Sequence, residues 1–175
     1  MASKQMQKVA TEVQTVLTGQ LQIGTSATLN NHTVTNMQLM KSHSWSGIFF
    51  PPPPQTITSH GGVARFIHLL GNKGSKAGVM YTITGAVTVE APYAVVLAWD
   101  APSNSRLSPN RLYGVLAPKS VIDKLTWETI EKELDKAGAS VEINDKVAKI
   151  SVHANLANNP KTEMAGLWAN FQLIP

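Results

Sequence analysis

Short runs that alternate apolar and polar residues recur through most of this 175-residue chain, with turn-forming residues between them. Residues 148–156 read AKISVHANL, and residues 164–174 read MAGLWANFQLI. A period of two is typical of a strand that turns one face toward a core. Many short strands at regular spacing predict a sandwich or a closed barrel, because a single sheet leaves its apolar face in water.

The sequence predicts a mostly β, antiparallel sandwich of about ten strands. The segments that predict strands are residues 21–29, 33–41, 64–70, 77–84, 93–99, 111–116, 139–143, 148–156 and 164–174. Asn30, Asn31 and His32 form a turn signal that predicts an antiparallel hairpin of the first two segments. Residues 71–74, GNKG, predict a second hairpin turn.

Two segments have a helical period instead. Ser3 to Thr18 contains no glycine or proline, and its larger apolar residues fall at spacings of three and four. They form one stripe of an amphipathic helix: Met6, Val9, Ala10, Val13, Val16 and Leu17. Such a stripe either packs on the sandwich or transfers to another surface such as a membrane.

The second helical segment covers residues 121–137. Ser120 or Thr126 can serve as its N-cap, and Gly138 can end it. Glu128 and Lys132 form an i,i+4 pair on its exposed side. We therefore expect two helices to flank the strands.

Composition fits one domain over residues 1–175, because 43% of the residues are apolar and only 15% are charged. The chain has no cysteine, no signal-peptide pattern and no run long enough to span a bilayer, so we expect a cytoplasmic protein. The formal charge of +4 comes from scattered basic residues, which argues against a nucleic-acid partner.

Four consecutive prolines, Pro51 to Pro54, follow the aromatic residues 45–50. They favour an extended conformation and cannot donate to a strand ladder. A structured surface loop is the first interpretation. A ligand for a proline-recognising module is the alternative, and it requires an exposed PxxP face.

Candidate chemical residues are few. His43, His60 and His68 match no compact metal-ligand spacing, and no serine lies in a G-x-S-x-G elbow, so we expect no metal, no cofactor and no enzyme activity. Trp99 and Trp168 lie in predicted strands and are expected in the core. Burial is the first interpretation for all four tryptophans. Partial exposure is the alternative for Trp45 and Trp127, where a tryptophan can stack on a sugar or enter headgroups.

In outline the chain resembles the actinoporin-like β-sandwich proteins, which include cnidarian pore-forming toxins and are related in structure to aegerolysins and fungal fruit-body lectins. Among plant proteins it is most similar to the jasmonate-induced protein family. Besides the N-terminal helix and the late helix before a final hairpin, the similarity rests on residues 35–49, on Gly61-Gly62-Val63-Ala64, on residues 74–81 and on residues 94–102.

The resemblance implies binding of a lipid headgroup or a glycan through loops at one end of the sandwich, with pore formation by detached N-terminal helices in the toxins. In those toxins a loop rich in tyrosine and tryptophan encloses choline. Here residues 100–111 replace that loop without aromatic residues, so phosphocholine specificity does not carry over. Arg106 and Arg111 suit a polar or anionic ligand. The expected ligand-binding residues are Trp45, Asp100, Asn104, Arg106, Arg111 and Tyr113.

Two functional hypotheses follow from this comparison. The first is a non-enzymatic stress or defence protein that binds membrane lipid or glycan, associates with membranes or is released on damage, and forms homo-oligomers or pores. The second is a cytosolic lectin or interaction module in which the N-terminal helix stays docked.

Overall fold

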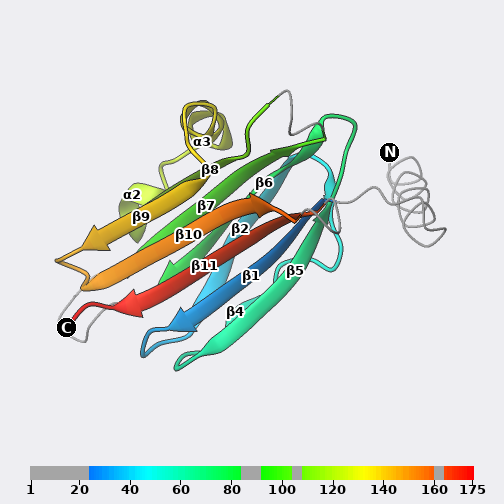
Figure 1. Ribbon diagram of the computed structural model, residues 1–175. Helices are drawn as coiled ribbons and strands as arrows, with labels where there is room; N and C mark the ends of the chain where they lie inside the picture. Colours follow the sequence, from blue (N-terminus) through cyan, green and yellow to red (C-terminus); the bar gives the residue numbers. More distant parts are fainter. Residues whose placement is uncertain (1–23, 84–91, 104–107, 160–163) are drawn as a thin grey trace, which may run out of the picture.

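The computed structural model describes residues 24–83, 92–103, 108–159 and 164–175 as two stacked sheets with two short helices on one of them (Figure 1). The predicted N-terminal helix, Ser3 to Thr18, with its apolar stripe lies outside the described residues. The strands are β1 (Gly24–His32), β2 (Met37–Ser46), β3 (Ile48–Phe49), β4 (Thr56–Ile57), β5 (Gly62–Leu69), β6 (Gly74–Ile83), β7 (Tyr93–Pro102), β8 (Arg111–Pro118), β9 (Ser140–Asp145), β10 (Ile150–Asn158) and β11 (Ala165–Leu173).

The six-stranded sheet has the order β3-β5-β1-β11-β10-β9, and the five-stranded sheet has the order β4-β2-β6-β7-β8. Neighbouring strands are antiparallel except β1 and β11, which run parallel with Thr28 opposite Trp168. The expectation of a mostly β protein is confirmed. The expectation that all strands are antiparallel is wrong for one pair, β1 and β11. These are the first and last described strands, and they lie side by side.

The predicted hairpin between residues 21–29 and 33–41 is wrong. β1 belongs to the six-stranded sheet and β2 to the five-stranded sheet, so the turn between them crosses from one layer to the other. The buried Asn31 fixes this crossing: its side chain donates to the carbonyl oxygens of Thr35 and Ile57, and accepts from the backbone of Thr33. A side chain that satisfies turn carbonyls lets the backbone leave its ladder without losing hydrogen bonds.

Residues 71–74 form a tight turn but also join the two sheets, β5 to β6, instead of closing a hairpin within one. Gly71 and Gly74 exchange two backbone hydrogen bonds, of 3.0 and 3.2 Å. Gly74 has a φ of +122°, and a Cβ there would lie 2.6 Å from the carbonyl oxygen of Ala101. Glycine is therefore required for the chain to pass so close to β7.

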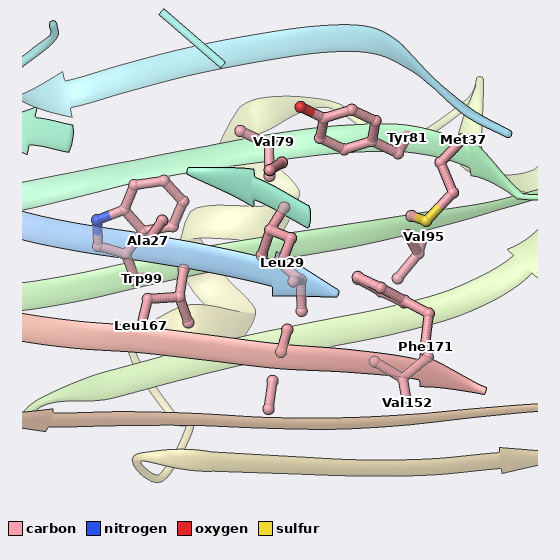
Figure 2. Packing of buried hydrophobic residues seen from close by; sticks show 14 of the residues in the cluster. Ala27, Leu29, Met37, Val79, Tyr81, Val95, Trp99, Val152, Leu167 and Phe171 are labelled. Carbon is pink, nitrogen blue, oxygen red and sulfur yellow. The ribbon is translucent and has the colours of Figure 1, made fainter. Parts of the chain in front are cut away.

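The core fills the space between the layers with alternate residues of facing strands (Figure 2). Leu29, Leu167 and Phe171 from the six-stranded sheet meet Val95 and Trp99 from the five-stranded sheet, and all are at most 1% exposed. This interdigitation is the usual way in which a sandwich removes both inner faces from water.

Strand β7 is buried on both of its faces, because two helices cover the outer side of the five-stranded sheet (Figure 1). Its inner residues are large, whereas the outer Ala94, Val96 and Ala98 are small. The small side chains let a helix approach the sheet closely. Strand β7 therefore consists almost entirely of apolar residues without alternation.

The single helix expected over residues 121–137 is instead two helices, α2 (Lys119–Ile122) and α3 (Trp127–Leu134). Thr126 is the N-cap of α3 and accepts from the backbone N–H of Thr129. An N-cap residue has a non-helical backbone, and Thr126 is extended, so a continuous helix cannot pass through this position. The Glu128–Lys132 pair is confirmed, with 2.7 Å between Oε1 and Nζ.

The four tryptophans divide differently from the expectation. Trp99 is fully buried, as predicted, but Trp168 is 46% exposed on the outer side of the six-stranded sheet. Its neighbours Leu167 and Ala169 point into the core, so the strand period places Trp168 on the opposite face. Trp45 and Trp127 are partly buried.

The proline segment is a structured loop between β3 and β4. It begins with a cis peptide bond between Phe50 and Pro51, and Pro53 is buried. The carbonyl oxygen of Pro54 accepts a 2.8 Å hydrogen bond from the hydroxyl of Tyr81. Pro51 and Pro52 are exposed, but this anchoring leaves no continuous four-residue proline face in solvent.

Candidate functional site

The four expected ligand-binding residues that the structure describes lie toward one end of the sandwich, which we call the loop end. Strands β2, β5, β7 and β10 finish there, and β1, β6, β8 and β11 begin there. The described chain also begins there, at Gly24. Asn104 and Arg106 lie outside the described residues, and the other four expected residues lie on the outer side of the five-stranded sheet.

Three of the strands at this end align charged residues. Lys76 of β6 lies opposite Asp100 of β7, which lies opposite Arg111 of β8. The α3 acids Glu131 and Asp135 complete the group: Lys76 Nζ lies 2.8 Å from Glu131 Oε1 and 3.1 Å from Asp135 Oδ1. Arg111 Nη1 lies 3.8 Å from Asp135 Oδ1. The cations are thus held within a protein network that joins the sheet to α3.

The electrostatics of this network follow from partial burial. Burial alone would lower the pKa of Lys76, but the hydrogen bonds to Glu131 and Asp135 outweigh it and the pKa is raised. Burial raises the pKa of Asp100, against the opposing effect of Lys76 and Arg111. The described part of this group contains two cations, Lys76 and Arg111, and three carboxyl groups. The carboxylates offset the positive charge, so the group attracts an anionic ligand less than an isolated Arg111 would.

An aromatic cluster adjoins the charges. Sequence reasoning named Trp45 and Trp127 separately but missed that His43 joins them in one cluster. The His43 ring stacks on Trp127 with centroids 5.1 Å apart, and meets Trp45 edge-on at 4.9 Å. Lys76 Nζ lies 5.8 Å from the centroid of the Trp45 ring. Burial lowers the pKa of His43, partly opposed by Glu131. The spacing of two residues between His43 and Trp45 indicated that both lie on one face of β2. Trp127 comes from a helix far along the chain, so its contact with them could not be read from the sequence.

Tyr113 follows Arg111 on the same face of β8 but packs with the apolar residues beneath α2 and α3. It is half-buried, and burial raises its pKa. The structure therefore brings Trp45, Asp100 and Arg111 together around Lys76, and places Tyr113 one step further toward the helices.

A separate polar group lies inside the loop end. Ser75 Oγ contacts Thr25 Oγ1 at 2.7 Å, His68 Nδ1 at 2.9 Å and the Trp99 indole N–H at 3.2 Å. His68 Nε2 lies 2.9 Å from Ser44 Oγ. Burial lowers the pKa of His68 to about 4. Because His68 and Ser75 have no exposed surface, this network connects the two sheets and offers no access to a ligand.

The three histidines considered as metal ligands lie in unrelated surroundings. His43 is in the aromatic cluster, His68 is in the buried network, and His60 is exposed beside Ser59. Across the described ranges no three His, Asp or Glu side chains are placed to share a metal ion. None of the helices in those ranges is both long and apolar enough to cross a bilayer.

Comparison with known proteins decides the family. The family model of Nakanori-like proteins matches residues 3–164. This chain belongs to the Nakanori-like family. A jasmonate-induced protein homolog from Atriplex canescens is 30% identical over 134 residues, which cover 73% of this chain and 69% of that protein. The resemblance to jasmonate-induced proteins is thereby confirmed, whereas the wider actinoporin-like relationship stays a prediction.

A solved structure shares the fold of this Nakanori-like chain. The crystal structure of the lipid-binding protein Nakanori superposes with a TM-score of 0.67 and 15% identity, over 95% of this chain and 80% of that one. At this identity the likeness concerns the fold alone. These two chains therefore share a fold although their sequences differ widely.

Proposed function

We propose that this chain binds membrane lipid headgroups without catalysing a reaction, and that the loop end faces the membrane. The observation that carries the proposal is membership of a family whose solved relative is a lipid-binding protein with this fold. The sequence resemblance to jasmonate-induced proteins supports a role in stress or defence.

The loop end offers chemistry suited to a headgroup layer. Trp45 is half-buried there, with an apolar ring beside a charged lysine, an arrangement common at membrane interfaces. Lys73, in the turn between β5 and β6, is exposed and forms no ion pair with any other described residue. A free lysine at this end attracts anionic lipid, whereas Lys76 and Arg111 are engaged by α3.

A non-enzymatic role is supported by the state of the titratable groups. The most strongly shifted histidine, His68, is enclosed in the core. Near the loop end, the charged groups of Lys76, Arg111, Glu131 and Asp135 pair with one another. Catalysis needs a reactive group next to a space for substrate, and neither arrangement offers one in the described part of the chain.

The N-terminal stripe of Met6, Val9, Ala10, Val13, Val16 and Leu17 enters the proposal as a second membrane contact. The described chain begins at the loop end, at Gly24, so the peptide chain connects this segment to the proposed membrane face. Burial of its apolar side in an interface contributes several kcal/mol at about 25 cal/mol per Å². In this proposal the protein is cytoplasmic and reaches membranes when cells are damaged. Oligomers and pores would require the N-terminal segments of several protein copies to detach.

The test is co-sedimentation of the full chain with vesicles of phosphatidylcholine alone, with added phosphatidylserine, or with added cholesterol. We expect binding to at least one composition. Lys73→Ala should weaken binding to the phosphatidylserine vesicles about fivefold, because a lysine near an anionic surface contributes about 1 kcal/mol. The matched control is Lys146→Ala, in the exposed turn between β9 and β10 at the opposite end, which should change nothing.

Absence of binding to all three compositions would refute the proposal, and equal effects of the two lysine variants would refute the orientation. Dye release from the same vesicles tests pores. A chain lacking residues 1–19 should lose release while keeping headgroup binding. A lectin with a docked helix is the second candidate, favoured by one specific feature, the exposed Trp168.

A further inference from the structure

We propose a carbohydrate-binding face on the outer side of the six-stranded sheet, with the Trp168 ring as the platform for a neutral pyranose. This Trp168 face consists of the outward side chains of Thr28, Asn30, His153, Asn155, Trp168 and Asn170 from three adjacent strands. It is separate from the loop end and does not rest on lipid binding.

The register places these side chains side by side. Thr28 of β1 and Asn155 of β10 flank Trp168 of β11 in one row, and Asn30, Asn170 and His153 form the next row. Strands lie about 4.8 Å apart, and residues two apart on a strand are separated by about 7 Å. Polar groups therefore surround a large aromatic ring on one rigid surface, without a loop that must first become ordered.

Trp168 is the unusual residue of this face. It is 46% exposed, whereas Trp99 is fully buried and the other two tryptophans are partly buried. An indole face is electron-rich and attracts the weakly positive C–H groups of a sugar ring lying flat on it. Leaving such a large apolar side chain in water on a sheet has a cost that binding of a ligand removes.

The amides beside Trp168 retain hydrogen-bonding capacity. Asn30 Nδ2 donates to Asn170 Oδ1 at 3.0 Å, which fixes the orientation of both groups. This leaves Asn30 Oδ1 as an acceptor and Asn170 Nδ2 as a donor, neither with a partner among the described residues. Asn155 is exposed on the other side of the indole. A fixed acceptor and a fixed donor suit the hydroxyl groups of a sugar, which both donate and accept.

The charge of the face points to a neutral ligand. Its six residues include no carboxylate, ammonium or guanidinium group. The nearest charges in the register lie at opposite sides, with Arg65 opposite Thr28 and Glu142 opposite His153. A single-sign charged ligand such as an anionic headgroup would gain little at the centre, whereas a polyhydroxylated neutral one meets complementary groups.

The apolar area is also too small for other partners. Trp168 is the one large apolar side chain among the six residues of the face. On β5 beside it, Ile67 is half-buried in the neighbouring row, and the smaller Val63 is 45% exposed opposite Asn30. An amphipathic helix or a second protein copy needs a broad apolar patch. A sugar needs one ring and several polar groups, which is the composition found here.

The experiment titrates the full chain with cellohexaose, laminarihexaose, chitohexaose and mannohexaose, following tryptophan fluorescence and heat of binding. We expect at least one to bind saturably and to change the emission of Trp168. Trp168→Ala should weaken that binding at least about tenfold, and Asn155→Ala several-fold. Trp168→Phe keeps an aromatic face and should retain most of the affinity. Gln172→Ala, exposed on the same strand two residues beyond Asn170, is the matched control and should bind normally.

Each variant is first checked for an unchanged melting temperature, and the predicted several-fold loss in Asn155→Ala is the test if Trp168→Ala does not fold. Absence of binding to all four sugars at millimolar concentrations would overturn the proposal. Sugar binding that is unchanged in Trp168→Ala would also overturn the proposal. A Trp168→Ala variant that loses vesicle binding or self-association in place of sugar binding would overturn it too. Vesicle binding should persist in Trp168→Ala, so failure of the carbohydrate face and failure of lipid binding give different results.

Discussion

At the scale of single residues, His68 links the pH dependence of stability to the junction of the two sheets. Both of its ring nitrogens lie 2.9 Å from serine hydroxyls, and burial lowers its pKa from 6.5 to about 4. Between these values the unfolded chain binds a proton that the folded chain does not, so stability is complete above pH 6.5 and falls as pH decreases. The loss approaches about 1.4 kcal/mol per pH unit.

The measurement is urea unfolding of the wild type and His68→Gln between pH 7 and pH 4.5. Whatever its absolute stability, His68→Gln should show the shallower decline with falling pH, because it lacks this proton. His60→Gln, at an exposed histidine, should keep the wild-type slope. Parallel curves for wild type and His68→Gln would show that His68 does not titrate in this way.

At the scale of elements, α3 depends more on the sheet than on its own helical turns. It has eight residues, fewer than an isolated helix needs to be stable in water. Ile130 and Leu134 are buried against β7 and β8. Ile130→Ala should therefore lower the free energy of unfolding by about 2–5 kcal/mol, and loss of the N-cap in Thr126→Ala by about 1 kcal/mol.

Chemical denaturation measures both values, with Lys132→Ala as the control. Lys132 forms an exposed pair with Glu128, so its removal should cost no more than about 0.5 kcal/mol. An effect of Ile130→Ala as small as that of Lys132→Ala would mean that α3 is not held by the sheet.

At the scale of the whole molecule, the fold closes only when its two described ends meet. β11 lies between β1 and β10, and Leu167 and Phe171 contribute to the core. A chain ending at residue 159 would expose one edge of β1 and of β10 and lose these core residues. We expect it to lose near-ultraviolet circular dichroism and cooperative thermal unfolding, because strand pairing and packing are lost together.

The comparison for this prediction is a chain that ends at residue 173, after the last residue of β11, which should unfold cooperatively. Retention of a sharp transition in the chain ending at residue 159 would show that β1 and β10 do not need the strand between them.

The sequence by itself determined the local features of this Nakanori-like chain. Most strands, the Thr126 cap and the Glu128–Lys132 pair were predictable, because residues one to four positions apart control them. The exposure of Trp168 was also encoded: it lies in phase with Gly166, Asn170 and Gln172, and out of phase with the core residues of β11. The large apolar side chain of Trp168 favoured the expectation that it lies in the core, which is wrong.

Only the tertiary structure decided which strands pair and which outer face is covered. Alternation distinguishes two faces of a strand but does not identify its neighbours, so the layer crossing at Asn31 and the parallel β1–β11 pair were not predictable. Likewise Trp45, Lys76 and Arg111 contact α3 because the helix folds back on the sheet. Contacts between residues far apart in the chain depend on packing of the whole molecule, and local spacing does not contain them.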